Sequence, residues 1–442
     1  MAALVLTSIL VVTIVLQARF PTRRMLIVLA GAGGSCLASA VFGGGGSREL
    51  LADVPWDVLV LLVTLGLLSE AFVEGRLFAV LAVRAAELSR ASPVGIALVF
   101  GVAMYCISAL MNNLTALVLV LPVVLIILKV SGASQRQVTW TLGTLLVACN
   151  LGGAATPIGD FPAILLLGRG AMSFTTYLVR AAPATMVAVL IILVVATLVL
   201  RRSQGRVGNE VRAAISRSLL RSLYRGARLE RRLVLWLSIV FVAMLAAWTL
   251  LPASGPISAD LVGWVGVLIA LAARPAFGER AIRTRVDVEA VLFLLALFVM
   301  VGAVRRTGVF TLVASGLTSL PVPPSVQLVL FLLLVGVVTG VFSAGPSMAA
   351  LLEVAAVLAT RLPPNVVYVG LALSVCAGSS LFLTAATAGP LAQSLTERTD
   401  LVGDDGARVR FGFTQFVPVG VVSFVAIELV AVGYCLIGLA LE

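Results

Sequence analysis

Apolar runs long enough to cross a lipid bilayer recur along the whole chain, separated by short segments that hold most of the arginines. A helix of roughly 20 apolar residues spans the hydrocarbon core. Hydrophobic residues make up 61% of the chain and charged residues 12%, against ordinary shares of about 45–50% and 25%. Period-2 alternation is scarce, which argues against a membrane β-barrel. The sequence therefore predicts an all-α integral membrane protein with about 11 spans.

Several chemical classes are disfavoured by what the chain lacks. It contains no histidine, the commonest metal ligand and general base. The five cysteines lie in apolar runs without a Cys-x-x-Cys pair, so we expect no disulfide framework. We also expect no cofactor other than a bound sodium ion. Met1 to Gln17 has no basic start and no small-residue cleavage site, so we interpret it as a retained first span.

The basic residues are distributed unevenly between the loops. With the two interrupted apolar pairs described below treated as re-entrant hairpins, 25 of the 31 lysines and arginines fall on one side, and the positive-inside rule makes this side cytoplasmic. The net charge of +11 therefore indicates a multi-pass protein of the cell membrane rather than a nucleic-acid partner. The predicted cytoplasmic loops are Arg19–Arg24, Arg76–Arg90, Lys129–Arg136, Arg201–Arg232, Arg274–Arg285 and Arg398–Arg410.

The second half of the chain repeats the first. The segment that begins at Val54 matches the segment that begins at Val286, and further along Cys149 matches Cys376. Each repeat contains a span, a hairpin and a span broken by Gly, Pro and polar residues. Since the charge-derived topology sends the first spans of the two repeats in opposite directions, we predict inverted repeats, which are typical of secondary transporters.

This pattern predicts five parts along the chain. They are N-terminal transmembrane helices (1–53), repeat 1 with its connecting span (54–200), a basic cytoplasmic linker with an interfacial helix (201–232), connecting spans (233–285), and repeat 2 with the last span (286–442).

Polar and helix-breaking residues gather at four places inside the apolar runs, where unpartnered polar groups are costly. The first hairpin tip and first break bring amides, a threonine and Asp160; the second pair brings mainly hydroxyls. They can also act as helix caps or as helix-to-helix hydrogen bonds. The predicted substrate or ion ligands are Asn112, Asn113, Thr115, Asn150, Gly153, Thr156, Asp160, Ser343, Ser347, Ser379, Ser380, Thr384 and Thr387.

Acids inside the membrane are functional candidates, because a buried charge must be partnered or neutralised. Asp160, Glu353 and Glu428 are the candidates for proton coupling. A sodium ion beside Asn113 and Asp160 is the predicted metal site.

Two of these motifs resemble those of a known superfamily. MNNLTALVLVLP resembles the hairpin tip of the ion transporter superfamily, and GGAATPIGDFP resembles its unwound loop. Its members include arsenite exporters, citrate and dicarboxylate carriers, and D-type sodium/proton antiporters. The resemblance covers roughly Val54 to Ser394. It implies a citrate-transporter-like domain with a scaffold, a moving unit, an elevator-type movement and often a homodimer.

Two departures decide between the possible substrates. The second hairpin tip, Ser343–Ser347, lacks the Ser-Asn-Thr motif of dicarboxylate carriers, and Asp160 would repel an anion. We therefore favour sodium/proton antiport over a carrier for arsenite, a di- or tricarboxylate or an inorganic oxyanion coupled to Na⁺ or H⁺. A channel is a remote alternative. An intramembrane aspartyl protease is disfavoured because a second mid-span aspartate is lacking, so no enzymatic activity is expected.

Overall fold

The computed structural model describes residues 1–20, 23–42, 45–89, 92–202, 229–251, 257–386, 388–403 and 406–441. Within these ranges the regular structure is helical apart from one isolated β-bridge between Val402 and Arg408. The all-α prediction is confirmed. The interfacial helix predicted in the basic linker falls largely on 203–228, outside the described residues.

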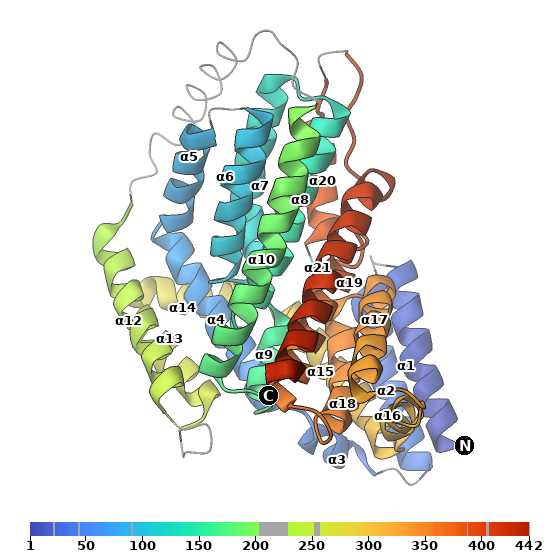
Figure 1. The fold of residues 1–442 in the computed structure, drawn as a ribbon. Coiled ribbons are helices and arrows are strands. Elements are labelled where there is room, and N and C mark those ends of the chain that lie inside the picture. Colours follow the sequence, from blue (N-terminus) through green and yellow to red (C-terminus); the bar gives the residue numbers. More distant parts are fainter. Residues whose placement is uncertain are drawn as a thin grey trace.

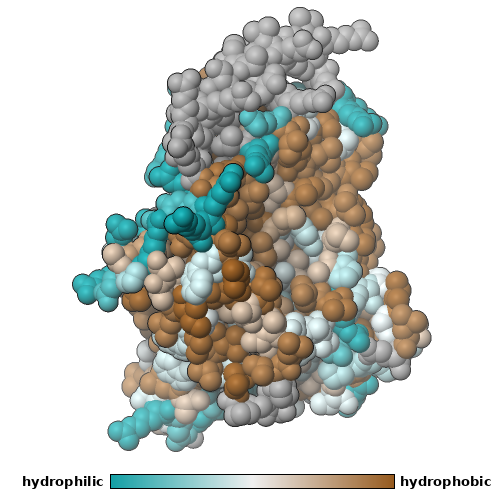
Figure 2. Space-filling view, turned by 90° about the vertical axis from the view of Figure 1, so that its left-hand side faces the viewer, coloured by the Kyte–Doolittle hydropathy of each residue, from teal (hydrophilic) through white to brown (hydrophobic). Residues whose placement is uncertain are grey.

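Nine of the described helices are long and apolar enough to cross a membrane. They are Arg24–Val41, Trp56–Glu74, Asn113–Ser131, Gln135–Ala155, Phe174–Arg201, Arg231–Leu250, Val288–Arg306, Pro324–Phe342 and Phe413–Leu441. Shorter apolar helices, such as Ala2–Gln17 and Pro364–Ser379, accompany them. Figure 2 shows a surface that is mainly apolar, with hydrophilic residues gathered in patches. Such a surface suits contact with lipid rather than water.

The two halves contain the same order of elements (Figure 1). The first half consists of α4 (Trp56–Glu74), α5 (Leu77–Ser89), the hairpin α6 (Pro93–Ser108) and α7 (Asn113–Ser131), the broken pair α8 (Gln135–Ala155) and α9 (Phe161–Gly168), and α10 (Phe174–Arg201). The second consists of α15 (Val288–Arg306), α16 (Val309–Thr318), the hairpin α17 (Pro324–Phe342) and α18 (Ala344–Leu358), the broken pair α19 (Pro364–Ser379) and α20 (Gly389–Thr399), and α21 (Phe413–Leu441).

The remaining helices flank these two series. They are α1 (Ala2–Arg19), α2 (Arg24–Val41), α3 (Ser47–Ala52), α12 (Arg231–Leu250), α13 (Ala259–Ala272) and α14 (Pro275–Thr284). Both predicted hairpins and both predicted breaks occur where the sequence places them. Figure 1 draws α6 and α7 toward the top and α17 and α18 toward the bottom. The inversion of the repeats, their sidedness and the division into five parts stay predictions.

Serine residues mark the starts of several helices. Ser92 caps α6, Ser134 forms a capping box with Gln137 at the start of α8, and Ser173 caps α10. Each serine satisfies a backbone N–H that the first helical turn leaves unpaired. The hairpin and the broken helix of the first half therefore begin at defined positions.

The buried apolar side chains form two separate hydrophobic cores. One, the upper core, contains α5, α6, α7 and most of α8 together with α20 and the first part of α21. The other, the lower core, contains α1, α2, α4, α9, α12, α13, α15 and the second hairpin. The chain passes from the upper to the lower core between Leu151 and Ile158, and from the lower to the upper between Val375 and Cys376. Thr156 of the first break lies within the first crossing, and Ser379 and Ser380 of the second break follow the second crossing at the end of α19.

Candidate functional site

The break between α8 and α9 is the centre of the candidate site. Helix α8 ends at Ala155, and Asp160 is the N-cap of α9, accepting a 2.9 Å hydrogen bond from the backbone N–H of Phe161 at Oδ1. The capping role that the sequence allowed for Asp160 is therefore real. The positive end of the α9 dipole also favours a negative charge at this carboxyl group.

The tip of the first hairpin is bound to this break. The Asn113 side chain is fully buried, and its Nδ2 donates to Asp160 Oδ2 at 2.9 Å. The amide oxygen of Asn113 accepts from the hydroxyl of Ser108, which also contacts the Cys149 carbonyl at 2.7 Å. Both ends of the Asn113 amide are thus engaged. This residue orients the carboxyl group of Asp160, and a cation bound between Asn113 and Asp160 would displace the hydrogen bond that joins them.

A second amide joins the two halves of the molecule. Asn150, near the end of α8, donates from Nδ2 to the Ser379 carbonyl at 3.3 Å and contacts the Ser380 hydroxyl at 3.2 Å. Both serines lie where α19 ends. The two breaks, which are far apart in the sequence, are therefore in direct contact.

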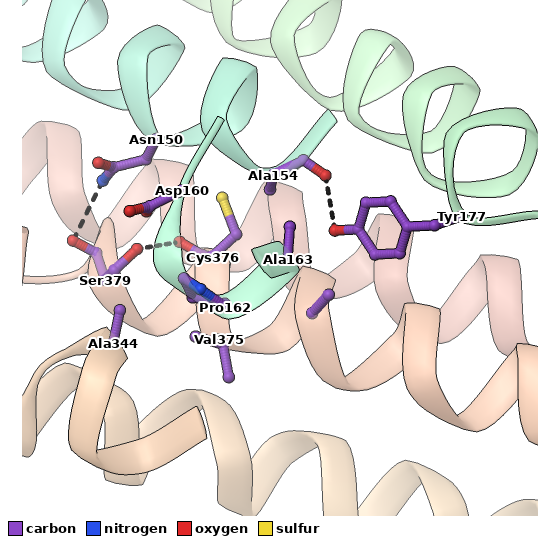
Figure 3. A pocket seen from close by; sticks show the side chains of 11 residues that line it. Asn150, Ala154, Asp160, Pro162, Ala163, Tyr177, Ala344, Val375, Cys376 and Ser379 are labelled. Carbon is purple, nitrogen blue, oxygen red and sulfur yellow. Dashed lines mark hydrogen bonds between the residues drawn. The ribbon is translucent and has the colours of Figure 1, made fainter. Parts of the chain in front are cut away.

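A small cavity lies between these elements (Figure 3). Its volume of about 10 Å³, counted as space open to the centre of a water molecule, is room for about one water. Figure 3 shows Asp160 beside Asn150, with Ser379 below them. Neither lysine nor arginine is among the described residues of its wall. The wall consists of Asn150, Ala154, Asp160, Pro162, Ala163, Tyr177, Ala344, Ala372, Val375, Cys376 and Ser379.

The other predicted ligands lie in varied surroundings. Thr156 donates to the Ala109 carbonyl at 2.5 Å and so helps to fix the first hairpin tip. Asn112 caps α7 by accepting from the N–H of Leu114. Thr115, Ser343, Ser347 and Thr384 are absent from the cavity wall, and Thr384 is exposed. Thr387 lies outside the described residues.

Comparison with known proteins places the chain in a family. The model of the family described as "CitMHS: Citrate transporter" matches residues 9–378. The chain belongs to this citrate transporter family. The predicted superfamily is thereby confirmed, and this citrate transporter family member is a multi-pass secondary transporter.

Individual relatives agree with this assignment. The magnetosome protein MamN of Paramagnetospirillum magneticum is 27% identical over 397 residues, which cover 89% of this chain and 88% of that protein. An uncharacterized transporter of Mycobacterium tuberculosis is 28% identical over 358 residues, with coverage of 79% and 80%. The crystal structure of the YdaH transporter of Alcanivorax borkumensis has a similar fold, with a TM-score of 0.56, 15% identity and coverage of 87% and 86%.

The structure places Glu353 of this family member in an ion-pair network instead of on the cavity wall. Its Oε1 lies 3.4 Å from Arg169 Nη1 and 3.5 Å from Arg305 Nη1. Arg305 also reaches Asp53 at 3.8 Å, and Arg306 contacts Asp53 at 2.7 Å. The Arg306 guanidinium holds the pKa of the Asp53 carboxyl below its usual value. The network ties α18 to α15 and to the segment before α4.

We expect Glu353→Gln to keep transport at the wild-type level, because Glu353 is bound by two arginines outside the cavity. The change should lower the stability by about 1 kcal/mol, since two partly exposed ion pairs are lost. Transport in proteoliposomes and thermal unfolding in detergent measure the two effects. A complete loss of transport in a folded variant would instead make Glu353 a coupling acid.

Sequence reasoning missed three residues at this site of the citrate transporter family member. The Tyr177 hydroxyl donates to the Ala154 carbonyl at 2.8 Å and lines the cavity, as does Cys376. Ser108 holds Asn113. Ser108 is a single polar residue in an apolar run, and Tyr177 follows two threonines at the start of an ordinary span, without a helix breaker beside it. The pairing of Cys376 with Cys149 in the repeat was the one available signal.

Proposed function

We propose that this protein exchanges sodium ions for protons and that Asp160 binds the two in turn. The proposal rests on the carboxyl group of Asp160, which lies on the wall of a cavity with room for about one water molecule. The described residues of this wall include no basic side chain. A site of this size suits a bare monovalent cation or a proton.

The chemistry of the wall supports a hard cation, which takes oxygen ligands. Asp160 offers carboxylate oxygens, and each accepts one hydrogen bond while a carboxylate has about four lone-pair sites in all. Asn150, Tyr177 and Ser379 bring an amide and two hydroxyls to the same wall. A sodium ion bound here would replace the proton on Asp160, because one carboxyl group cannot hold both at full strength. This competition is what obligatory exchange requires.

The movement that carries the site across the membrane belongs to the same proposal. The resemblance to the ion transporter superfamily favours an elevator-type displacement of the hairpins and broken helices in a homodimer. Asn113 and Asn150 support a unit that moves together, because they bind the first hairpin tip to Asp160 and the first break to the second.

A small-anion carrier is the second candidate, since the family description names citrate. Citrate carries three carboxyl groups, and the negative charge of Asp160 would repel them. The described wall of the cavity has no basic residue to offset this repulsion. Such a carrier would need a conformation in which arginines reach a much wider cavity. Arsenite and inorganic oxyanions are smaller members of the same class.

Reconstituted protein in proteoliposomes separates the two candidates. A sodium gradient should move protons, followed with a trapped pH-sensitive dye, and citrate should leave this movement unchanged. Proton movement driven by citrate, arsenite or another anion, without a response to Na⁺ or Li⁺, would replace the exchange proposal with the anion carrier. Proteoliposomes without protein are the control for leak.

A further inference from the structure

A second buried carboxyl group lies in the other half of the molecule. Glu428, in α21, is 4% exposed. Its Oε1 accepts a 3.0 Å hydrogen bond from the Ser374 hydroxyl of α19. Its Oε2 is buried and has no hydrogen-bond partner among the described residues. One neutral donor is a small compensation for a buried charge.

The second oxygen of this carboxyl group lies against the backbone of α17. A Cβ added to Gly336 of α17 would lie 3.0 Å from Glu428 Oε2. The glycine therefore leaves the space that this oxygen occupies, and it offers the oxygen no side-chain donor.

The surroundings of Glu428 favour its neutral, protonated form. Helices α8, α10, α17 and α19 pack against α21. Gly336 and Ser374 face Glu428 from α17 and α19, and the ionisable neighbour on its own helix is Cys435. In the described part of the chain, no ionisable residue of these four packed helices donates a hydrogen bond to Glu428 Oε2. The ionisable residues of these helices are Arg136, Cys149, Tyr177, Arg180, Arg201, Tyr368 and Cys376. A carboxylate without a cationic partner is costly at membrane depth, so this position is suited to bind and release a proton.

We propose that Glu428, held by Ser374, is a second proton-binding site of the transporter, separate from Asp160. Its carboxylate takes a proton from the aqueous phase to become a neutral acid and returns it when the phase becomes alkaline. Helix α19 connects the two sites, because Ser374 contacts Glu428 and the same helix ends at the serines that bind Asn150. As a coupling site, Glu428 rests on the proposed exchange function; as a proton-binding site, it does not.

Infrared difference spectroscopy on the purified full-length protein tests the proton directly. Between acid and alkaline pH, the wild type should show the C=O stretching band of a protonated carboxyl group. Glu428→Gln should remove one such band, Asp160→Asn should leave that band in place, and Ser374→Ala should shift its frequency. Glu428→Leu, which replaces the carboxyl group by an apolar side chain, should also lack the band. A spectrum that Glu428→Gln leaves unchanged would overturn the proposal.

Sodium-induced proton release then tests the coupling. In weakly buffered detergent solution, sodium should release fewer protons per molecule from Glu428→Gln than from the wild type. If the wild type releases none, the exchange function fails while the infrared result still decides whether Glu428 binds a proton. If the wild type releases protons and Glu428→Gln releases the same number, Glu428 is not a coupling site and the exchange at Asp160 stands.

Discussion

Asp160→Asn is expected to abolish sodium-driven proton movement while the protein remains folded. Asparagine keeps an oxygen that can cap α9 and an amide that fits the same space, but it can neither take up a proton nor offer a negative charge to sodium. Asparagine caps a helix about as well as aspartate, but its single oxygen cannot also accept from Asn113, so the loss of stability should be about 1–3 kcal/mol. Proton movement in proteoliposomes and thermal unfolding in detergent measure the two effects.

A matched control for this variant exists in the same chain. Asp287 is also an N-cap, accepting from the N–H of Ala290 at 2.9 Å at the start of α15, in an exposed position. Asp287→Asn should therefore repeat the effect on capping and leave exchange unchanged. Full exchange in Asp160→Asn would contradict the central role of this carboxyl group. Loss of exchange in both variants would indicate a general effect of aspartate removal.

Gly159→Ala should have the second largest effect, on both stability and ion binding. A Cβ at Gly159 would lie 2.7 Å from the Cα and carbonyl oxygen of Gly153 and 2.7 Å from the Ser108 carbonyl oxygen. These are backbone atoms, so the methyl group must push the first hairpin tip away from the break. Overpacking of this kind costs roughly 1–3 kcal/mol or more, and it would displace Asn113 from Asp160.

Stabilisation by sodium in thermal unfolding measures this effect, and it should be lost in Gly159→Ala. The control is Gly66→Ala on α4, where an added Cβ meets nothing within 4 Å. Replacing glycine by alanine inside a helix stabilises by about 0.5–1 kcal/mol, so Gly66→Ala should unfold at an equal or higher temperature. If sodium stabilises Gly159→Ala as much as the wild type, the break can accommodate a methyl group for which the structure leaves no room.

The helices, the hairpins and the breaks could be predicted because each follows from local chemistry. Apolar length gave the spans, and Gly, Pro and amide clusters gave the interruptions near Asn113 and Asp160. Short helices such as α5 and α16 were missed, since they lie beside loops and lack the length of a span. Their existence depends on packing against the hairpins, which a single sequence does not display.

The candidate site was predictable where several polar residues cluster, and poorly predictable elsewhere. Asn150, Asp160 and Ser379 line the cavity, as the density of polar residues at the breaks suggested. Ser343 and Thr384 carry similar hydroxyls yet lie away from the wall, because helix direction and tip geometry decide where a hydroxyl points. Ser343 has a positive φ of 80°, a backbone conformation that spacing alone does not reveal.

The passage of the chain between the two hydrophobic cores bears on what a bound ion would contact. Residues 152–157 connect the cores, because α8 belongs mostly to the upper core and α9 to the lower core. A ligand of Asp160 would therefore bind where the chain passes from one core to the other, and its contacts would bridge them. Ion occupancy would then influence how tightly the two cores are held together at this point.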